Sequence, residues 1–235
     1  MSGTAFWVVG VDASGAERVR ELLGHGDDPV RLLARTGFAT TSPSSVVGEA
    51  DPHTVTVTYP VVPDPGLADG PAGEVPHDPG LLFAPGEEPL VRQRVAVYAV
   101  VRSARGVLLA QNSALTNAAG TWGLAGGGLD HGELPEAALH REVWEETGQV
   151  VEVTSVAAVT TRHWVGRAPN GRLENFHAVR LVYRATCPDP TDPVVHDAHG
   201  TTSAAAWFPV GALADLPLAV WTREVLAHLS RDDGG

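Results

Sequence analysis

The sequence contains no lysine, only one cysteine and no long apolar run, and each of these absences excludes a class of protein. With Cys187 as the only cysteine, no internal disulfide can form, which excludes a secreted fold stapled by disulfides. The longest clear apolar run, residues 95–101, is far shorter than a membrane span. All 16 basic residues are arginine, so phosphate has to be bound by arginine, backbone N–H groups or a metal ion rather than by a P-loop lysine.

Positive charge is also scarce. The formal net charge of −12 over 235 residues disfavours broad electrostatic binding to nucleic acid or to an anionic membrane. The first five residues, Met-Ser-Gly-Thr-Ala, do not have the charged-then-apolar pattern of a signal peptide. We therefore expect a cytoplasmic protein that acts on a small molecule, without a nucleic acid polymer or a membrane as its partner.

The distribution of proline and charged residues divides the chain into three parts. Residues 60–89 hold eight of the 18 prolines, which is typical of an extended linker or a surface strap. We expect a small α/β unit at 1–62, a Pro/Gly-rich linker at 63–90 and the main domain at 91–230. The first unit carries no chemical motif, which favours a packing or dimerisation role. It remains open whether residues 1–90 complete an active site, within one chain or across a homodimer.

The expected elements follow from periodicity and capping signals. In the first unit, Ser14 followed by Glu17 resembles a capping box and predicts a helix ending at Leu23, while Pro29 is suited to the first turn of a second helix. Gly148 is suited to the position just after a helix end. Strands are expected at 6–11, 53–62, 91–102, 106–111, 150–164, 176–187 and 204–209, and the other helices at 134–147 and 218–229.

Three carboxylates fall on one side of the helix expected at 134–147. On a helix, residues three and four apart are neighbours, so Glu142, Glu145 and Glu146 form one cluster. Like charges at this spacing destabilise a bare helix, and a hard divalent cation such as Mg²⁺ offsets that repulsion. Val143 and Trp144 are expected to turn away from the cluster toward a core. An acidic helix face in solvent is the alternative for the pair Glu145-Glu146 alone.

The residues around the cluster suit the same chemistry. Glycines at 126–128 let backbone groups approach a phosphate or a metal closely. Arg141 lies next to Glu142, and at i,i+4 from Glu145 it is placed to hold the carboxylate of Glu145. Glu133, just before the helix, is expected to cap the turn rather than to bind metal.

Residues 127–149 resemble the Nudix box: Gly, five residues, Glu, seven residues, then Arg-Glu-apolar-any-Glu-Glu-any-Gly-apolar. All seven fixed letters match, and Val143 meets the inner apolar position. The sequence departs from the pattern at Gln149, where the closing residue is usually apolar, and at Ala125, where many members have proline. The resemblance extends over about residues 91–230 and is greatest to the MutT-like group.

The resemblance implies an α/β/α sandwich with a mixed sheet, and Mg²⁺- or Mn²⁺-dependent hydrolysis of a nucleoside diphosphate linked to another moiety. It implies catalytic roles for Arg141 and the three glutamates, with Glu142, Glu145 and Glu146 as metal ligands together with the carbonyl of Gly126. Gly127, Glu133 and Gly148 would support the loop and helix. The group that accepts the proton of the attacking water stays open between Glu142, Glu146 and a glutamate outside the box, such as Glu174.

Outside the box, two segments flank one expected turn. Trp164 or Phe176 is a candidate for stacking on a base, Arg162 or Arg167 for binding phosphate, and Glu174 also lies here. A core aromatic or a surface arginine is the alternative for each. His196 and His199 are expected in a polar loop rather than in a second metal site.

The substrate class is the least constrained part of the prediction. The residues that mark ADP-ribose-cleaving, dinucleoside-polyphosphate-cleaving, NADH-cleaving and coenzyme A-cleaving relatives are missing. We therefore favour a nucleoside triphosphate pyrophosphatase, with oxidised nucleotides among the candidate substrates. Two alternatives stay open: a nucleotide-sensing or regulatory Nudix-fold module without turnover, and a pyrophosphatase for ADP-ribose or another nucleotide sugar.

Overall fold

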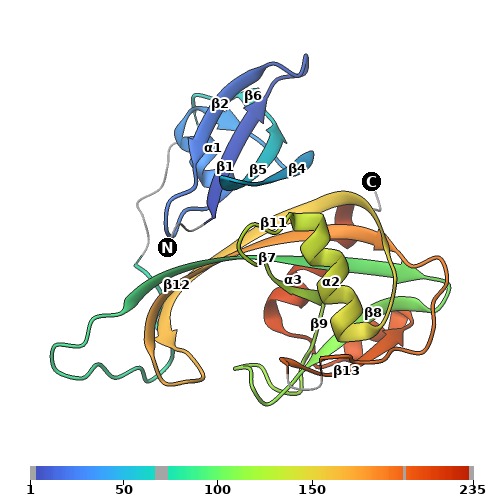
Figure 1. Ribbon diagram of the computed structural model, residues 1–235. Coiled ribbons are helices and arrows are strands. Elements are labelled where there is room, and N and C mark those ends of the chain that lie inside the picture. Colours follow the sequence, from blue (N-terminus) through green and yellow to red (C-terminus); the bar gives the residue numbers. More distant parts are fainter. Residues whose placement is uncertain (1–3, 67–73, 198–199, 233–235) are drawn as a thin grey trace. The chain divides into compact units, whose positions relative to one another are not determined.

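The computed structural model describes residues 4–66, 74–197 and 200–232, and its contacts divide the chain into two compact units (Figure 1). The first unit draws on residues 1–96, 128–135 and 159–181, and the second on 97–127, 136–158 and 182–235. The two units interleave along the chain because three long strands each contribute residues to both. The boundaries at residues 62 and 90 therefore stay a prediction.

The N-terminal part of the first unit is a four-stranded sheet with the order β2-β1-β5-β4 in the described residues. The central pair, β1 and β5, is parallel, whereas β2 and β4 pair with it antiparallel at the edges. In β5, Val55, Val57 and Tyr59 are buried and alternate with threonines, as expected for a strand with one face on a core. The bounds are β1 Ala5–Val11, β2 Glu17–Leu22, β4 Ser45–Ala50 and β5 His53–Pro60.

The helix expected from Ser14 to Leu23 is wrong, because this segment forms β2 and its turn. Asp12 Oδ1 accepts hydrogen bonds from the backbone N–H and the hydroxyl of Ser14, so the side chain of Ser14 takes part in this turn. Gly15, with φ of 83°, closes the turn, and the strand then pairs with β1. A local capping pattern was thus overridden by hairpin pairing.

The helix predicted to begin at Pro29 is confirmed. Helix α1 spans Pro29–Arg35, and the carboxylate of Asp28 accepts hydrogen bonds from the backbone N–H groups of Val30 and Arg31. Leu33, on the inner side of this helix, is fully buried. Two short strands, β3 (Phe38–Ala39) and β6 (Val62–Pro63), pair beside this helix.

The larger sheet has the strand order β11-β12-β7-β8-β13 among the described residues, with β10 beside β7 and β9 beside β8. The strands predicted in this region are all confirmed, with ends that differ by a few residues. The bounds are β7 Leu90–Ser103, β8 Gly106–Asn112, β9 Trp122–Gly123, β10 Ala125–Gly128, β11 Glu152–Arg167, β12 Leu173–Thr186 and β13 Thr202–Phe208.

In the second unit, this sheet buries both of its faces. On one face, Val100, Leu109 and Val182 pack with Val225 and Leu229 of helix α3 (Val220–Asp232), which follows a 3₁₀ turn at Val210–Asp215. Because side chains alternate along a strand, the neighbours of these residues face the opposite side. Those neighbours are also buried, as are Ala138, Leu139 and Val143 of helix α2 (Pro135–Thr147), so the second unit is a layered α/β/α arrangement.

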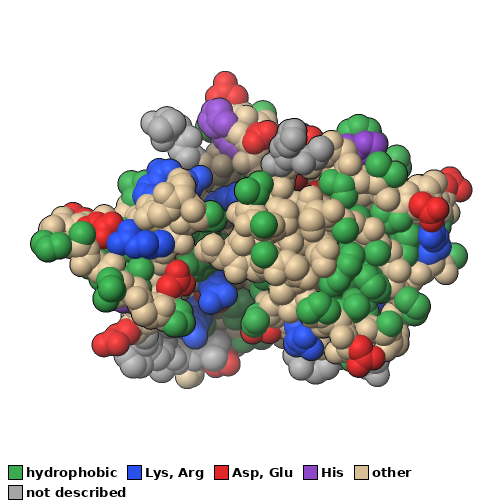
Figure 2. Space-filling view, turned by 90° about the horizontal axis from the view of Figure 1, so that it is seen from below, with side chains coloured by type: hydrophobic (Ala, Val, Ile, Leu, Met, Phe, Trp, Pro, Cys, Tyr) green, Lys and Arg blue, Asp and Glu red, His purple; other side chains and the backbone are tan. Residues whose placement is uncertain are grey.

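No helix in the described ranges combines the length and the apolar character needed to cross a membrane. Figure 2 shows arginine side chains in small separate groups, interspersed with acidic and apolar ones, on the face that it presents.

Candidate functional site

Helix α2 buries Val143 but leaves its neighbour Trp144 half-exposed. Val143 is fully buried, which agrees with the helical position expected from the sequence. Trp144 was expected to face the core, but this is wrong: 49% of it is exposed, and its ring stacks on that of His196 at 4.1 Å. Trp144 lies about 100° further round the helix than Val143, beyond the edge of the buried stripe.

The carboxylate of Glu142 lies directly against the backbone of Gly127. A Cβ atom at Gly127 would come within 2.4 Å of the carboxylate atoms, so the absence of a side chain makes room for them. Gly126 has φ of 144°, and a Cβ there would come within 2.1 Å of the carbonyl oxygen of Val97. The two glycines of β10 are therefore required by close packing, one by the backbone and one by a carboxylate.

Glu146 is the most buried of the three carboxylates, at 8% exposure. Its Oε2 accepts a hydrogen bond from the backbone N–H of Gly126 at 2.9 Å, and its Oε1 accepts one from the hydroxyl of Thr202 at 2.5 Å. The pKa of Glu146 is raised to about 7, chiefly by burial; the two hydrogen bonds oppose the rise, and the nearby charges of Glu142 and Asp197 contribute to it. A cation at this place would favour the ionised form of Glu146, because it would offset both the cost of burying the negative charge and the repulsion from Glu142 and Asp197.

Arg141 contacts two of the three carboxylates. Its Nη1 lies 2.9 Å from Glu142 Oε1 and 3.2 Å from Glu145 Oε2, the latter being the i,i+4 pair expected from the sequence. The arginine side chain is partly exposed, so these ion pairs contribute little to stability. Their main effect is to fix the direction of the two carboxylates.

The donor set of this site fits a divalent cation that shares its shell with other oxygens. Carboxylates and a backbone carbonyl are the ligands that Mg²⁺ and Mn²⁺ prefer. Within the described residues, no group of three or more His, Cys, Asp or Glu side chains is arranged to hold an ion by itself. A cation here would therefore complete its coordination with water and substrate phosphate, as Mg²⁺ usually does.

A segment just before β13 clamps the end of helix α2. The backbone N–H groups of His196 and Asp197 both donate to the carbonyl of Glu145, and that of Val194 donates to Thr147. Gly148 ends the helix with φ of 66°, as predicted, and a Cβ there would meet the ring of His196. His196 thus packs against Trp144 and the end of the helix, and His199 lies outside the described residues.

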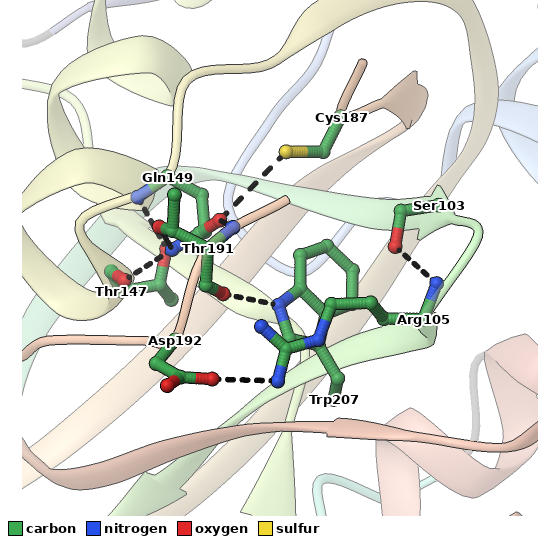
Figure 3. Close-up of polar contacts among 8 residues, drawn as sticks. All are labelled: Ser103, Arg105, Thr147, Gln149, Cys187, Thr191, Asp192 and Trp207. Carbon is green, nitrogen blue, oxygen red and sulfur yellow. Dashed lines mark hydrogen bonds and ion pairs between the residues drawn. The ribbon is translucent and has the colours of Figure 1, made fainter. Parts of the chain in front are cut away.

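Gln149, the polar residue at the closing position of the box, is buried and fully used (Figure 3). Its amide Nε2 donates to the carbonyl of Thr147 and to the hydroxyl of Thr191, and its Oε1 accepts from the backbone N–H of Thr191. Cys187 Sγ lies 3.8 Å from the same oxygen, and Trp207 Nε1 donates to the carbonyl of Thr191. An amide here ties the end of α2 to the segment after β12, which an apolar residue could not do.

A cavity of about 530 Å³ lies in the second unit, and one of its lining residues is the hydrogen-bonding partner of Glu146. Thr202, whose hydroxyl bonds Glu146, forms part of its wall. Ser113 joins two of the lining segments, because its hydroxyl donates to the carbonyl of Gly200. The walls carry no charged side chain; they consist of residues 113–115, Val195, Gly200, Thr202 and Ser203.

The residues predicted to bind substrate lie together in the first unit, on β11 and β12. Trp164 and Phe176 pack at 4.9 Å between ring centroids, and the guanidinium of Arg162 lies 5.3 Å from the ring of Trp164. Glu174 is buried and lies 3.4 Å from Arg92 and 3.8 Å from Arg172. Their contact with substrate stays a prediction.

Two other predicted residues of the first unit have structural contacts. Glu133 Oε2 accepts a hydrogen bond from the backbone N–H of Asp130 and so closes the turn before α2. Arg167 forms a two-pronged ion pair with Glu87 and donates to the carbonyl of Leu82, which holds the segment before β7 against β11. Arg167 is thus engaged in structure.

A cluster of three histidines in the first unit was not foreseen. His25 and His163 both donate to Asn175 Oδ1, at 3.0 and 2.6 Å, and their ring centroids are 4.8 Å apart. His177 lies 5.6 and 5.9 Å from these two rings and bonds Gln93. His25 is more than a hundred residues from its partners, so no sequence spacing could reveal the cluster.

Comparison with known proteins decides the family. Residues 92–229, more than half of the chain, match the NUDIX domain family. The chain is a member of the Nudix family. The fold of this Nudix hydrolase is also seen in the MutT protein of Methanosarcina mazei Go1, with a TM-score of 0.50, 20% identity, and coverage of 63% of this chain and 99% of that one.

Two curated relatives are more similar in sequence. A MutT-like protein of Streptomyces ambofaciens is 48% identical over 102 residues, which cover 40% of this chain but only 64% of that protein. The nucleoside triphosphatase NudI of Salmonella schwarzengrund (strain CVM19633) is 33% identical over 110 residues, which cover 46% of this chain and 75% of that protein. The family predicted from the box is confirmed.

Proposed function

We propose that this Nudix hydrolase is a Mg²⁺- or Mn²⁺-dependent nucleoside triphosphate pyrophosphatase, with oxidised nucleotides among its candidate substrates. The observation that carries the proposal is the placement of Glu142 and Glu146 against the glycines of β10. The kinship with the nucleoside triphosphatase NudI supports the substrate class.

In this proposal, Glu142, Glu145 and Glu146 hold the cation together with the carbonyl of Gly126. Arg141 orients Glu142 and Glu145, with which it already forms ion pairs. A bound cation would supply charge for the phosphoryl oxygens and lower the pKa of the attacking water.

Three further residues support this arrangement. Gly127 leaves room for the carboxylate of Glu142. Glu133 closes the turn before α2, and Gly148 ends the helix so that residues 194–197 can clamp it. These contacts hold the carboxylates in place before any ligand arrives, which lowers the ordering cost of binding.

The cavity beside Thr202 is the place that we assign to the nucleoside. Its volume of about 530 Å³ is within the usual range for small-molecule sites. Because its walls carry hydroxyl and apolar groups but no charge, they suit a neutral ribose and base better than another phosphate.

A substrate panel tests the proposal. The full chain would be given Mg²⁺ or Mn²⁺ with nucleoside triphosphates, 8-oxo-dGTP, ADP-ribose, NADH, diadenosine polyphosphates and nucleotide sugars, and the products would be separated. We expect nucleoside monophosphate and pyrophosphate from a triphosphate, and a rate lowered by roughly 10²-fold in Glu146→Gln. Turnover of ADP-ribose alone would overturn the substrate class, and nucleotide binding without any turnover would favour a sensing module.

A further inference from the structure

Thr202 reaches the carboxylate helix from a distant part of the chain. Its hydroxyl donates to Glu146 Oε1 at 2.5 Å, and both side chains are buried. The backbone N–H of Gly126 holds the other oxygen. Each carboxylate oxygen accepts more than one bond, so both can still face a cation. Glu146 is thus held from two sides without losing its capacity to bind metal.

The direction of Thr202 comes from an irregularity in β13. This strand pairs antiparallel with β8, and its register shifts between Thr202 and Ala204. A bulge of this kind re-aims a side chain relative to a regular strand. The exposed Ser203 hydroxyl donates to the carbonyl of Gln111, and the backbone N–H of Ser113 donates to that of Thr201, so the strand is anchored on both sides of Thr202.

We infer that Thr202 is a positioning residue for the metal-binding carboxylate of Glu146, an inference that rests on the proposed function. Without the hydroxyl, only the Gly126 N–H would fix the Glu146 side chain. Part of the free energy of metal binding would then be lost in ordering that side chain. Hydrogen-bonding partners of metal ligands typically change metal affinity by 10- to 100-fold when they are removed.

Direct Mn²⁺ binding to the full chain, followed by electron paramagnetic resonance, is the test. Thr202→Val keeps the shape of the side chain and removes the hydroxyl, so its dissociation constant is expected to rise by roughly 10-fold or more. Thr202→Ser restores a hydroxyl and is expected to recover most of the affinity. Thr201→Val makes the same chemical change at the exposed neighbouring position and should bind Mn²⁺ as the wild type does.

The outcomes separate this inference from the proposed function. If the wild type binds Mn²⁺ and Thr202→Val binds it equally well, the inference is overturned while the metal site stands. If the wild type binds no Mn²⁺, the proposed function fails with it. Should Thr202→Val not fold, Thr202→Ala would be measured instead, with circular dichroism establishing that the protein is folded.

Discussion

The carboxylate of Glu142 occupies the space that a side chain at Gly127 would fill, with a hypothetical Cβ only 2.4 Å from its atoms. The contact joins helix α2 to strand β10 at the centre of the candidate site. Because the atoms concerned are the far end of a flexible side chain, a small group at residue 127 would displace the carboxylate rather than disrupt the backbone. A small side chain at residue 127 should therefore impair the function of Glu142 while leaving the protein folded.

Gly127→Ala is expected to fold and to lose activity. Gly127 has no positive φ, so alanine is compatible with its backbone. The methyl group would push Glu142 away from the place where the cation binds, lowering metal-dependent turnover by roughly 10-fold or more, as for other metal-site changes. Steady-state kinetics at several Mg²⁺ concentrations, together with a melting curve, measure both effects.

Gly211→Ala is the matched control, because nothing lies within 4 Å of the position that its Cβ would take. This variant is expected to keep the wild-type rate. Full activity in Gly127→Ala would show that the position of Glu142 against β10 does not matter for turnover.

Residues close together in the chain were the predictable part of the site. The helix bearing Glu142, Glu145 and Glu146, its end at Gly148 and the burial of Val143 all follow from helical geometry. The exposure of Trp144 was not predictable, because the width of the buried stripe depends on what packs against it. The helix expected at Ser14 failed for a related reason: strand pairing with β1 outweighed a local capping signal.

Replacing Gln149 by leucine tests why this chain departs from the usual apolar residue. The backbone N–H of Thr191 would lose its hydrogen bond to the amide oxygen, whereas the carbonyl of Thr147 would keep the bond from the backbone N–H of Val194. A buried group left without its partner costs about 1–3 kcal/mol, so Gln149→Leu should be less stable by about that amount in urea unfolding. Turnover by the folded protein should change little, because no carboxylate moves.

A double-mutant cycle with Thr191→Val sharpens this result. Gln149 Nε2 donates to the hydroxyl of Thr191, so the two substitutions should be less than additive. Strict additivity, or a more stable Gln149→Leu, would contradict the role given to the amide.

Leu115 allows the assignment of the cavity to be tested without disturbing the core. It lines the cavity and is 59% exposed, so Leu115→Trp should fold while filling part of the space. We expect KM for the nucleoside triphosphate to rise by about 10-fold, one 1.4 kcal/mol step, with little change in kcat. Leu22→Trp, at an exposed position of the N-terminal sheet, is the control. Equal KM values for the two variants would contradict the assignment of this cavity as the nucleoside-binding site.

The histidine cluster predicts how stability depends on pH. The pKa of His177 is lowered from 6.5 to about 4, chiefly by burial and also by the nearby rings of His25 and His163, while Asp27 opposes the shift. The unfolded chain therefore binds a proton more readily than the folded protein between these two pH values. Stability from this group is complete above about pH 6.5 and is lost as the pH falls toward 4, with a slope of at most about 1.4 kcal/mol per pH unit.

His177→Gln should remove this part of the slope. Urea unfolding of the wild type and the variant at pH 8, where both side chains are neutral, gives the baseline difference in free energy. As the pH falls from 6.5 to 4.5, the free energy of unfolding of the wild type is expected to decrease relative to that of the variant. A difference that does not change with pH would contradict the lowered pKa of His177.

Contacts between distant segments are what the sequence could not provide. Thr202 is 56 residues from Glu146, and its side chain turns toward the carboxylate because of an irregular register in β13. The link between His25 and Asn175 spans 150 residues. Neither pair has a characteristic spacing, since each depends on which strands become neighbours in the fold. The box supplied the carboxylates, whereas the groups that hold Glu146, and the cavity that Thr202 lines, could be found only in the structure.

In the proposed function, three glutamates of one helix hold a divalent cation against the phosphates of a nucleotide. Crystals of the full chain grown with Mn²⁺ and a non-hydrolysable nucleoside triphosphate, measured for anomalous scattering, test it most directly. We expect an anomalous peak bonded to carboxylate oxygens of Glu142, Glu145 and Glu146 and to phosphate oxygens. Bound nucleotide with no peak at these residues, and with their oxygens facing solvent, would contradict it.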